Sequence, residues 1–242
     1  MEFKTIILSG GLGTRLRSVI GDLPKPMADI SGRPFLEYLL DYLIENDIKK
    51  VIMSVGYKSQ NIIKYFGKSY RSINIEYSLE DEPLGTGGAI KKAVNNMENS
   101  NEIFFVLNGD TFFDVPLEEM IDFHIQKKSL LTIALKPMTE CKRYGSVLLD
   151  DSNRIIGFIE KGYYKNCFIN GGIYIINKKL FELVNLPEKF SFEKELLEVF
   201  YRKFLFFGKI FDKFFIDIGV PEDYERFKKD IRLYKKGGLL DE

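Results

Sequence analysis

Short apolar strands alternate with amphipathic helices along the first half of this 242-residue chain, and this alternation constrains its fold more than any other feature. The sequence predicts strands at Phe3–Leu8, Lys50–Val55, Ile73–Tyr77 and Ile103–Leu107, with intervening helices at Phe35–Glu45, Ser59–Phe66 and Gly87–Met97. Such alternation is typical of parallel βαβ units. Because the strands are apolar at consecutive positions, we expect a sheet that helices cover on both faces.

The second half of the chain keeps the strands but has fewer helices between them. Strands are predicted at Leu131–Leu135, Ser146–Leu149, Ile155–Glu160, Gly172–Ile176, Leu205–Ile210 and Phe214–Ile216, and helices from Pro116, at Phe192–Phe200 and at Pro221–Tyr234. No linker separates the halves, so we expect one α/β domain of three layers over residues 1–242. Its halves, 1–111 and 112–235, would share one Rossmann-like, mixed and mostly parallel sheet. Ligands of such sheets bind beyond the carboxyl ends of the strands.

The composition is that of a folded protein with no overall charge. Hydrophobic residues make up 45% of the chain, and 35 Lys and Arg residues balance 35 Asp and Glu residues. This balance disfavours nucleic acid or an anionic membrane as a partner, so any phosphate binding must be local. We find neither a signal-peptide pattern nor an apolar run that could span a bilayer, and we expect a cytoplasmic protein. The cysteines, Cys141 and Cys167, are not a C-x-x-C pair, so we expect free thiols rather than a disulfide.

A glycine-rich turn follows the first predicted strand. It reads Leu8-Ser9-Gly10-Gly11-Leu12-Gly13-Thr14-Arg15, and Lys25-Pro26-Met27 begins ten residues after the arginine. Glycines let backbone N–H groups fold around a phosphate without a Cβ in the way. Arginine and lysine can hold charge that shifts between phosphates during a reaction. The turn therefore indicates chemistry on a nucleoside triphosphate.

This turn differs from two common phosphate-binding loops. A P-loop needs G-x-x-x-x-G-K-[ST], which the chain lacks. A dinucleotide fingerprint needs a third small residue, and Leu16 stands at that position. Taken alone, the glycines could equally form a plain turn followed by an incidental arginine.

A second glycine-rich run, Gly85-Thr86-Gly87-Gly88, follows Glu80-Asp81-Glu82-Pro83-Leu84. Thr86 as an N-cap of the next helix explains part of this run. Three glycines in four residues are costly to order. We therefore expect their backbone to lie against a flat ligand.

Two aspartates, Asp110 and Asp217, each end a short apolar strand. A carboxylate at such a strand end projects into the ligand-binding edge of the sheet. The alternative is a turn aspartate that accepts hydrogen bonds from its own backbone. The second half adds three runs, Arg143-Tyr144-Gly145-Ser146-Val147, Phe158-Ile159-Glu160-Lys161 and Asn170-Gly171-Gly172-Ile173-Tyr174, which alone are typical of hairpins.

Taken in order, these motifs resemble those of the sugar-phosphate nucleotidyltransferases, also called nucleotide-sugar pyrophosphorylases. The matching runs are G-G-x-G-T-R-L…K-P-M, L-G-T-G-G-A, G-D, R-Y-G-x-V, F-x-E-K, N-x-G-x-Y and D-x-G-x-P-x-D-Y. The resemblance extends from Phe3 to Tyr224 and implies a single nucleotidyltransferase domain. Residues 1–111 would be its nucleotide-binding half and 112–235 its sugar-phosphate-binding half.

The resemblance also implies roles for individual residues. The catalytic residues would be Arg15 and Lys25. Arg15 would hold the triphosphate and the departing pyrophosphate, and Lys25 would contact the reacting α-phosphate. The nucleotide would be bound by Leu8, Gly10, Gly11, Gly13, Thr14, Glu80, Gly85 and Thr86. The sugar phosphate would be bound by Asn108, Gly145, Glu160, Lys161 and Asn170, with Lys161 on its phosphate. Asp110 and Asp217 would bind Mg²⁺, which takes one or two carboxylates together with phosphate oxygens and water.

Glu80 indicates which base the site accepts. Its position resembles one where thymidylyl- and uridylyltransferases of this family carry Gln. A carboxylate only accepts hydrogen bonds. Guanine offers two adjacent donors, whereas uracil and thymine offer one N–H beside carbonyls, so Glu80 favours GTP.

The expected reaction joins GTP and a sugar 1-phosphate to give a GDP-sugar and pyrophosphate, without a covalent enzyme intermediate. The length and the E-P-L-G-T-G-G-A-I run resemble the D-glycero-α-D-manno-heptose 1-phosphate guanylyltransferases of bacterial capsule and surface polysaccharide pathways. Alternatives are a mannose 1-phosphate guanylyltransferase, an N-acetylmuramate 1-phosphate uridylyltransferase and a non-catalytic homologue that binds nucleotide sugar. Such a homologue would be expected to lack Arg15, Lys25, Asp110 or Asp217, and all four are present. The family also implies a homodimer.

Overall fold

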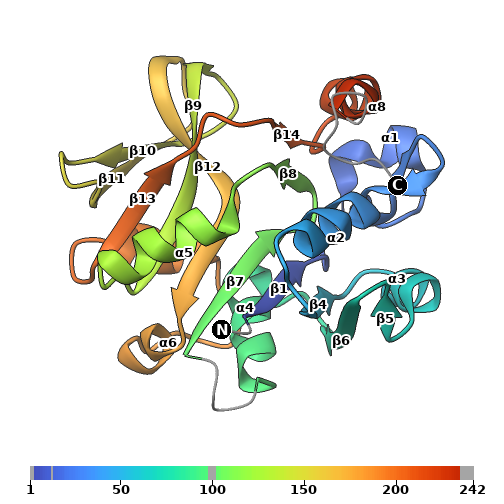
Figure 1. Ribbon diagram of the computed structural model, residues 1–242, viewed down its shortest axis with the longest axis horizontal. Helices are drawn as coiled ribbons and strands as arrows, with labels where there is room; N and C mark the ends of the chain where they lie inside the picture. The colour runs from blue at the N-terminus through green and yellow to red at the C-terminus, as the bar shows by residue number, and fades with distance from the viewer. Residues whose placement is uncertain (1–2, 12, 98–101, 235–242) are drawn as a thin grey trace.

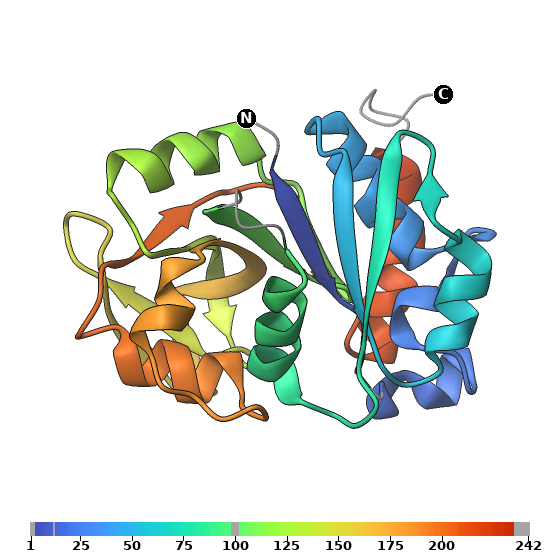
Figure 2. The ribbon, with the colours of Figure 1, turned by 90° about the horizontal axis from the view of Figure 1, so that it is seen from below.

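One mixed sheet forms the centre of the molecule, with helices on both faces (Figures 1 and 2). The computed structural model describes residues 3–11, 13–97 and 102–234. The order of the strands is β11-β10-β12-β7-β1-β4-β6-β5, and β9 and β13 extend the sheet from β12. Strands β7, β1, β4 and β6 are mutually parallel, whereas β12 runs antiparallel to β7. The predicted α/β fold with a mixed, mostly parallel sheet is confirmed.

The elements of the first half lie close to their predicted positions. The strands are β1 (Lys4–Leu8), β2 (Asp29–Ile30), β3 (Arg33–Pro34), β4 (Lys50–Val55), β5 (Ser69–Tyr70), β6 (Ile73–Leu79) and β7 (Ile103–Asn108). The helices are η1 (Thr14–Leu16), α1 (Arg17–Ile20), η2 (Lys25–Met27), α2 (Phe35–Glu45), α3 (Ser59–Phe66) and α4 (Gly85–Asn95). Strand β4 and helices α2 and α3 match the prediction at both ends.

The second half contains longer strands than the sequence predicts. Its strands are β8 (Thr111–Phe113), β9 (Leu131–Cys141), β10 (Ser146–Leu149), β11 (Ile155–Ile159), β12 (Tyr164–Asn177), β13 (Phe206–Ile210) and β14 (Phe215–Asp217). Its helices are α5 (Leu117–Gln126), α6 (Lys179–Leu183), η3 (Phe192–Leu197), α7 (Glu198–Phe200) and α8 (Pro221–Tyr234). Strands β9 and β12 pair over most of their length, beyond the apolar segments that the sequence predicts as strands.

Both faces of the sheet are buried, as the consecutive apolar residues predict. Neighbouring residues of β1 point to opposite faces, so Ile6 and Ile7 belong to two different hydrophobic clusters. Helices α2 and α8 contribute to the cluster around Ile7, whereas α4, α6 and η3 contribute to the cluster around Ile6. None of the described helices is both long and apolar enough to cross a membrane.

Three parallel strands end side by side at one edge of the sheet. Leu8, the last residue of β1, pairs in register with Ser54 of β4 and Asn108 of β7. Strand β6 pairs Leu79 with Val55 at the same edge, so Glu80 follows there. The glycine-rich turn, Glu80 and Asp110 are thus brought to the carboxyl edge of the sheet.

The end of the chain returns to this edge. Strand β14 pairs with β8, which places Asp217 beside Thr111. Helix α8 then packs against α2, with Phe227 at ring-centroid distances of 5.2 Å from Phe35 and 5.7 Å from Tyr38. Figure 1 shows α8 next to α1. The fold therefore joins segments about two hundred residues apart around one edge.

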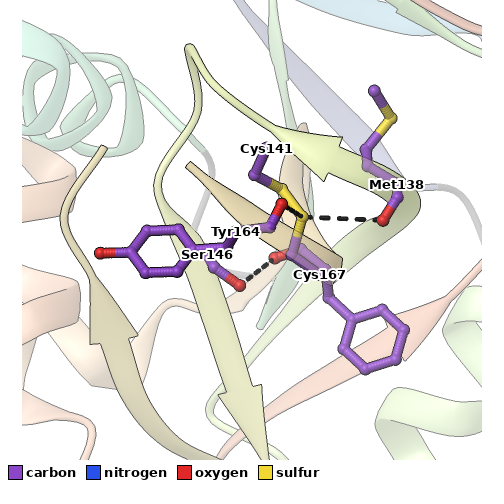
Figure 3. The surroundings of a disulfide bond; sticks show 6 residues. Met138, Cys141, Ser146, Tyr164 and Cys167 are labelled. Carbon is purple, nitrogen blue, oxygen red and sulfur yellow. Dashed lines mark hydrogen bonds between the residues drawn. A yellow bond between two sulfur atoms is a disulfide. The ribbon is translucent and has the colours of Figure 1, made fainter. Parts of the chain in front are cut away.

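The expectation of free thiols is wrong. Cys141 and Cys167 form a disulfide across the antiparallel pair β9 and β12 (Figure 3). Both residues are buried, in a small cluster that includes Ile169, Tyr144 and Phe215. The register brings the two cysteines together from 26 residues apart, and a spacing of that length has no sequence signature.

Candidate functional site

A pocket of about 440 Å³ opens at the carboxyl edge of β1 and β7, and we call it the larger pocket. Its walls are Leu8, Ser9, Gly10, Gly11, Gly13, Lys25, Pro26, Glu80, Pro83, Gly85, Thr86, Ala89, Asn108 and Asp110. These residues include every predicted nucleotide-binding residue except Thr14, which begins η1. They also include Lys25, Asn108 and Asp110, which the sequence assigned to other roles.

A second pocket of about 150 Å³, the smaller pocket, is formed mainly by the second half of the chain. Its walls are Arg15, Arg143, Tyr144, Gly145, Lys161, Asn170, Asp217, Gly219, Val220 and Asp223. The predicted residues Gly145, Lys161 and Asn170 lie here. Glu160 lies after β11, is exposed and lines neither pocket. Arg15 lines this pocket rather than the larger one.

Glu80 lies directly against the glycine-rich turn. Its Oε1 accepts a hydrogen bond of 3.1 Å from Ser54 Oγ, and its Oε2 accepts one of 3.1 Å from Leu84 N. A Cβ on Gly10 would overlap Oε1. Glycine at position 10 therefore makes room for the Glu80 carboxylate, which two hydrogen bonds hold in the wall of the larger pocket.

The turn also positions Lys25. Gly13 has a φ of +60°, and a Cβ there would lie 3.0 Å from Cγ of Lys25. Lys25 begins the short helix η2, and its Nζ lies 2.7 Å from Oδ2 of Asp110. The Lys25 side chain is 12% exposed, so the ammonium is held in the wall of the larger pocket by its ion pair with Asp110.

The two predicted metal-binding aspartates lie close together. The N–H of Ile218, next to Asp217, donates to the backbone carbonyl of Asp110 at 3.0 Å. Burial and the Asp110 carboxylate raise the pKa of Asp217, against the opposing effects of Lys25, the Gly219 N–H and Arg15. Asp110 lines the larger pocket and Asp217 the smaller one, so the two pockets meet at these carboxylates.

These carboxylates alone do not make a complete protein-built metal site. Within the described residues, no group of three or more His, Cys, Asp or Glu side chains could hold a metal ion. Two neighbouring carboxylates nevertheless suit Mg²⁺, which usually keeps several waters and substrate phosphate oxygens as its remaining ligands.

The second glycine-rich run is compact for a structural reason that the sequence did not reveal. A Cβ on Gly87 would overlap the ring of Phe190, and a Cβ on Gly88 would overlap the carbonyl oxygen of Glu188. Gly87 N also donates to Phe190 O at 3.0 Å. Gly85 also packs against this segment before η3, since a Cβ there would lie 2.5 Å from Phe190 O, and it lines the larger pocket as well.

Thr86 does not cap its own helix, contrary to the prediction. Helix α4 begins at Gly85, and no side chain caps it. The Thr86 hydroxyl instead donates to Glu193 Oε2 at 2.8 Å and accepts from Phe192 N at 2.9 Å. Thr86 therefore links α4 to the start of η3 through its hydroxyl, and it also lines the larger pocket.

In the smaller pocket, the side chain of Asn170 is held by its own strand. Its Nδ2 donates to Tyr174 Oη at 2.9 Å, and its Oδ1 accepts from Gly172 N at 3.0 Å. A Cβ on Gly145 would lie 2.9 Å from Ile159 O, so glycine lets β10 and β11 approach here. Lys161 is exposed, and the described residues contain no ion-pair partner for it.

Two charged residues of the smaller pocket belong to the sequence motifs, although the sequence predicts no function for them. Arg143 of R-Y-G-x-V and Asp223 of D-x-G-x-P-x-D-Y form an ion pair. Tyr144 lies beside them, and burial together with the Asp217 charge raises its pKa to about 12. The motif letters were the available signal, but only the fold shows that these segments meet.

The arrangement favours chemistry on phosphates. The larger pocket combines backbone N–H groups of a glycine-rich turn with Lys25, and the smaller pocket contains Arg15 and Lys161. Paired carboxylates lie where the pockets meet. Such a site can bind two phosphate-bearing molecules and stabilise charge that moves between them.

The comparisons with known proteins agree with this geometry. A family model described as nucleotidyl transferase matches residues 4–232. The D-glycero-alpha-D-manno-heptose 1-phosphate guanylyltransferase of Aneurinibacillus thermoaerophilus is 52% identical over 231 residues, which covers 96% of this chain and 99% of that protein. A protein of the same name from Campylobacter jejuni is 49% identical over 224 residues, with 93% and 98% covered.

Solved structures give the same result. HddC from Yersinia pseudotuberculosis is 39% identical, with a TM-score of 0.84 over 95% of this chain and 99% of that chain. A second HddC structure, complexed with GMP-PN, has a TM-score of 0.83. With the family model spanning both pockets, the chain is an enzyme of the nucleotidyl transferase family.

Proposed function

We propose that this chain transfers GMP from GTP to a sugar 1-phosphate, giving a GDP-sugar and pyrophosphate, and that the acceptor is D-glycero-α-D-manno-heptose 1-phosphate. One observation supports the type of reaction. The two pockets meet at Asp110 and Asp217, and Lys25 forms an ion pair with Asp110 there. The names and near full-length identity of the two relatives support the choice of acceptor.

The larger pocket would hold the nucleotide. Glu80 supports guanine, because Ser54 and Leu84 fix a carboxylate that retains acceptor capacity for two adjacent donors. The glycine-rich turn would place its N–H groups on the triphosphate. The structure complexed with GMP-PN belongs to a relative and supports a guanine nucleotide by similarity.

The smaller pocket would hold the acceptor. Lys161 and Arg15 are its cations without a carboxylate partner within the described residues, so they suit the phosphate of a sugar 1-phosphate. Gly145 and Asn170 would face the sugar. Glu160, predicted to bind sugar, lines neither pocket and has less support.

In the reaction, an oxygen of the acceptor phosphate attacks the α-phosphorus of GTP in line, and the bond to pyrophosphate breaks. Lys25 would stabilise charge on the α-phosphate. Arg15, which the sequence assigned to the triphosphate and the departing pyrophosphate, lines the smaller pocket and would instead hold the acceptor phosphate against the nucleotide. Asp110 and Asp217 would hold Mg²⁺, which when bound offsets the charge of the departing pyrophosphate. Positioning and charge stabilisation suffice for phosphoryl transfer of this kind.

A pyrophosphate-release screen tests this proposal. Four nucleoside triphosphates are crossed with D-glycero-α-D-manno-heptose, α-D-mannose and N-acetylmuramic acid 1-phosphates, with and without MgCl₂. We expect the highest kcat/KM for GTP with the heptose, and loss of activity in EDTA. Preference for mannose 1-phosphate or for UTP with N-acetylmuramate 1-phosphate would establish the respective alternative.

The broader setting is proposed on resemblance alone. The GDP-heptose would serve bacterial capsule or surface polysaccharide synthesis. The cytoplasmic location and the homodimer stay predictions. Size-exclusion chromatography with light scattering would measure the oligomeric state.

A further inference from the structure

A buried carboxylate that the proposed reaction does not use holds one arginine of the smaller pocket. Arg143 Nη2 pairs with Asp223 Oδ2, and both residues line the pocket. The Asp223 side chain is 7% exposed, whereas that of Arg143 is 50% exposed. A guanidinium has five N–H donors in a planar fork. One side of this fork is therefore anchored, and the other side is available to a ligand in the pocket.

The ion pair joins two segments that meet only in the folded chain. Asp223 is the third residue of α8, and Arg143 lies in the turn between β9 and β10. The guanidinium carbon lies 5.8 Å from the centre of the Tyr144 ring. That ring packs edge-on against Phe215 of β14, at a centroid distance of 6.2 Å. The guanidinium is thus held beside the strand that ends in Asp217.

The charge environment of Arg143 differs from that of the other two cations of the pocket. In the described part of the chain, Arg15 and Lys161 have no carboxylate within ion-pair distance. Asp223 offsets the charge of Arg143. An offset guanidinium attracts a phosphate dianion less strongly, but its remaining N–H groups still donate hydrogen bonds to neutral oxygens. Arg143 therefore suits sugar hydroxyls better than the phosphate.

We propose that Arg143 determines acceptor specificity by donating hydrogen bonds to hydroxyl oxygens of the sugar, and that Asp223 is a positioning residue for its guanidinium. The inference rests on the proposed function, which makes the ligand of this pocket a sugar 1-phosphate. A site built to hydrogen-bond a hydroxyl rejects an analogue that lacks it, because the donor is left unpaired. Arg143 would therefore discriminate between sugars that share the same phosphate.

The first experiment replaces the donor. In Arg143→Ala, the KM for D-glycero-α-D-manno-heptose 1-phosphate is expected to rise about tenfold or more, as for loss of a hydrogen bond to a charged group. The KM for GTP is expected to stay within twofold of wild type. Arg143→Lys keeps the charge but loses the planar fork, so most of the increase should persist in that variant.

The second experiment separates hydroxyl recognition from phosphate recognition. Wild type and Arg143→Ala are compared on a set of monodeoxy analogues of the heptose 1-phosphate. For the analogue that lacks the contacted hydroxyl, the two proteins should have similar kcat/KM values. A loss of equal size on every analogue would mean that Arg143 binds the phosphate, and would overturn the proposal.

The third experiment tests Asp223 with a matched control. Arg226 Nη2 lies 3.6 Å from Asp223 Oδ1 but does not line the pocket. Asp223→Asn alone should raise the KM for the acceptor relative to wild type. The double variant Arg143→Ala/Asp223→Asn should have the same acceptor KM as Arg143→Ala. Arg226→Ala, which removes the other partner of the same carboxylate, should leave that KM unchanged. Thermal unfolding of each variant separates these effects from loss of stability.

The outcomes distinguish this inference from the proposed function. A wild-type chain that releases no pyrophosphate with any acceptor overturns both. An active wild type whose acceptor KM is the same in Arg143→Ala overturns the specificity role alone. Equal increases of the KM for GTP and for the acceptor would assign the ion pair a purely structural role, which also overturns it.

Discussion

The ammonium of Lys25 lies 2.7 Å from the carboxylate of Asp110, 85 residues further along the chain, and both residues line the larger pocket. The start of the short helix η2 contributes one partner, and the turn after β7 contributes the other. This contact joins a residue proposed to act on the α-phosphate with one proposed to hold Mg²⁺. The pair therefore lies where nucleotide and metal would meet.

Lys25→Ala should reduce kcat by about a hundredfold or more, because loss of one preorganised cation costs roughly 3 kcal/mol of transition-state stabilisation. Steady-state pyrophosphate release with saturating substrates measures this effect. Lys136→Ala is the matched control, since its ammonium pairs with Asp212 at 2.6 Å and lines neither pocket. Near-normal kcat in Lys25→Ala would contradict the catalytic role.

Glu80→Gln should weaken the preference for guanine. The amide keeps one acceptor but replaces the other with a donor, which repels a guanine donor and matches a uracil carbonyl. We expect the ratio of kcat/KM for GTP to that for UTP to fall about tenfold or more. Glu82→Gln, two residues away, exposed and outside the pocket walls, should leave the ratio unchanged. A constant ratio in Glu80→Gln would exclude Glu80 from base selection.

The first half of the fold was predictable because its signals are local. Lys50–Val55 is apolar at consecutive positions and becomes a central parallel strand, and the apolar spacing of Phe35–Glu45 defines α2. The carboxyl edge of such a sheet is fixed by topology, so Leu8, Glu80 and Asp110 could be assigned to one site. Their arrangement follows from strand order more than from side-chain detail.

The misassigned features depend on partners distant in sequence. Position 87 must be glycine because the ring of Phe190, about a hundred residues later, occupies the space of a Cβ. Thr86 likewise donates its hydrogen bond to a distant residue, Glu193. The paired ends of β9 and β12 carry polar residues that break any strand periodicity, so their length and the disulfide within them were missed. No local pattern records which distant backbone approaches a glycine or a cysteine.

Reduction of the Cys141–Cys167 disulfide should lower the free energy of unfolding by about 3.5 kcal/mol, the loop-closure entropy of a 26-residue separation. Urea unfolding of the wild type with and without a phosphine reductant measures the difference. The double variant Cys141→Ala/Cys167→Ala should unfold near the reduced wild type and should not respond to reductant. The cysteines would be shown not to be bonded if the unfolding free energy of the wild type did not change with reductant. In that case two free thiols would also be titrated after unfolding without reductant.

His124 should make the protein less stable in mild acid. It is 2% exposed, its Nδ1 lies 2.8 Å from Thr132 Oγ1, and its Nε2 is buried without a hydrogen-bond partner among the described residues. Burial lowers its pKa from 6.5 to about 4. Because the unfolded chain then binds the proton more tightly, the stability is complete above about pH 6.5 and is lost as the pH falls toward 4.

The loss attributable to His124 is at most about 3 kcal/mol, from 1.36 kcal/mol for each unit of its pKa shift. Urea unfolding between pH 7.5 and 4.5 is compared for the wild type and His124→Gln, whose amide can still bond Thr132 but does not titrate. The wild-type free energy of unfolding should fall more steeply than that of the variant. Parallel pH profiles would mean that the imidazole is accommodated in its charged form, and that its burial does not govern acid stability.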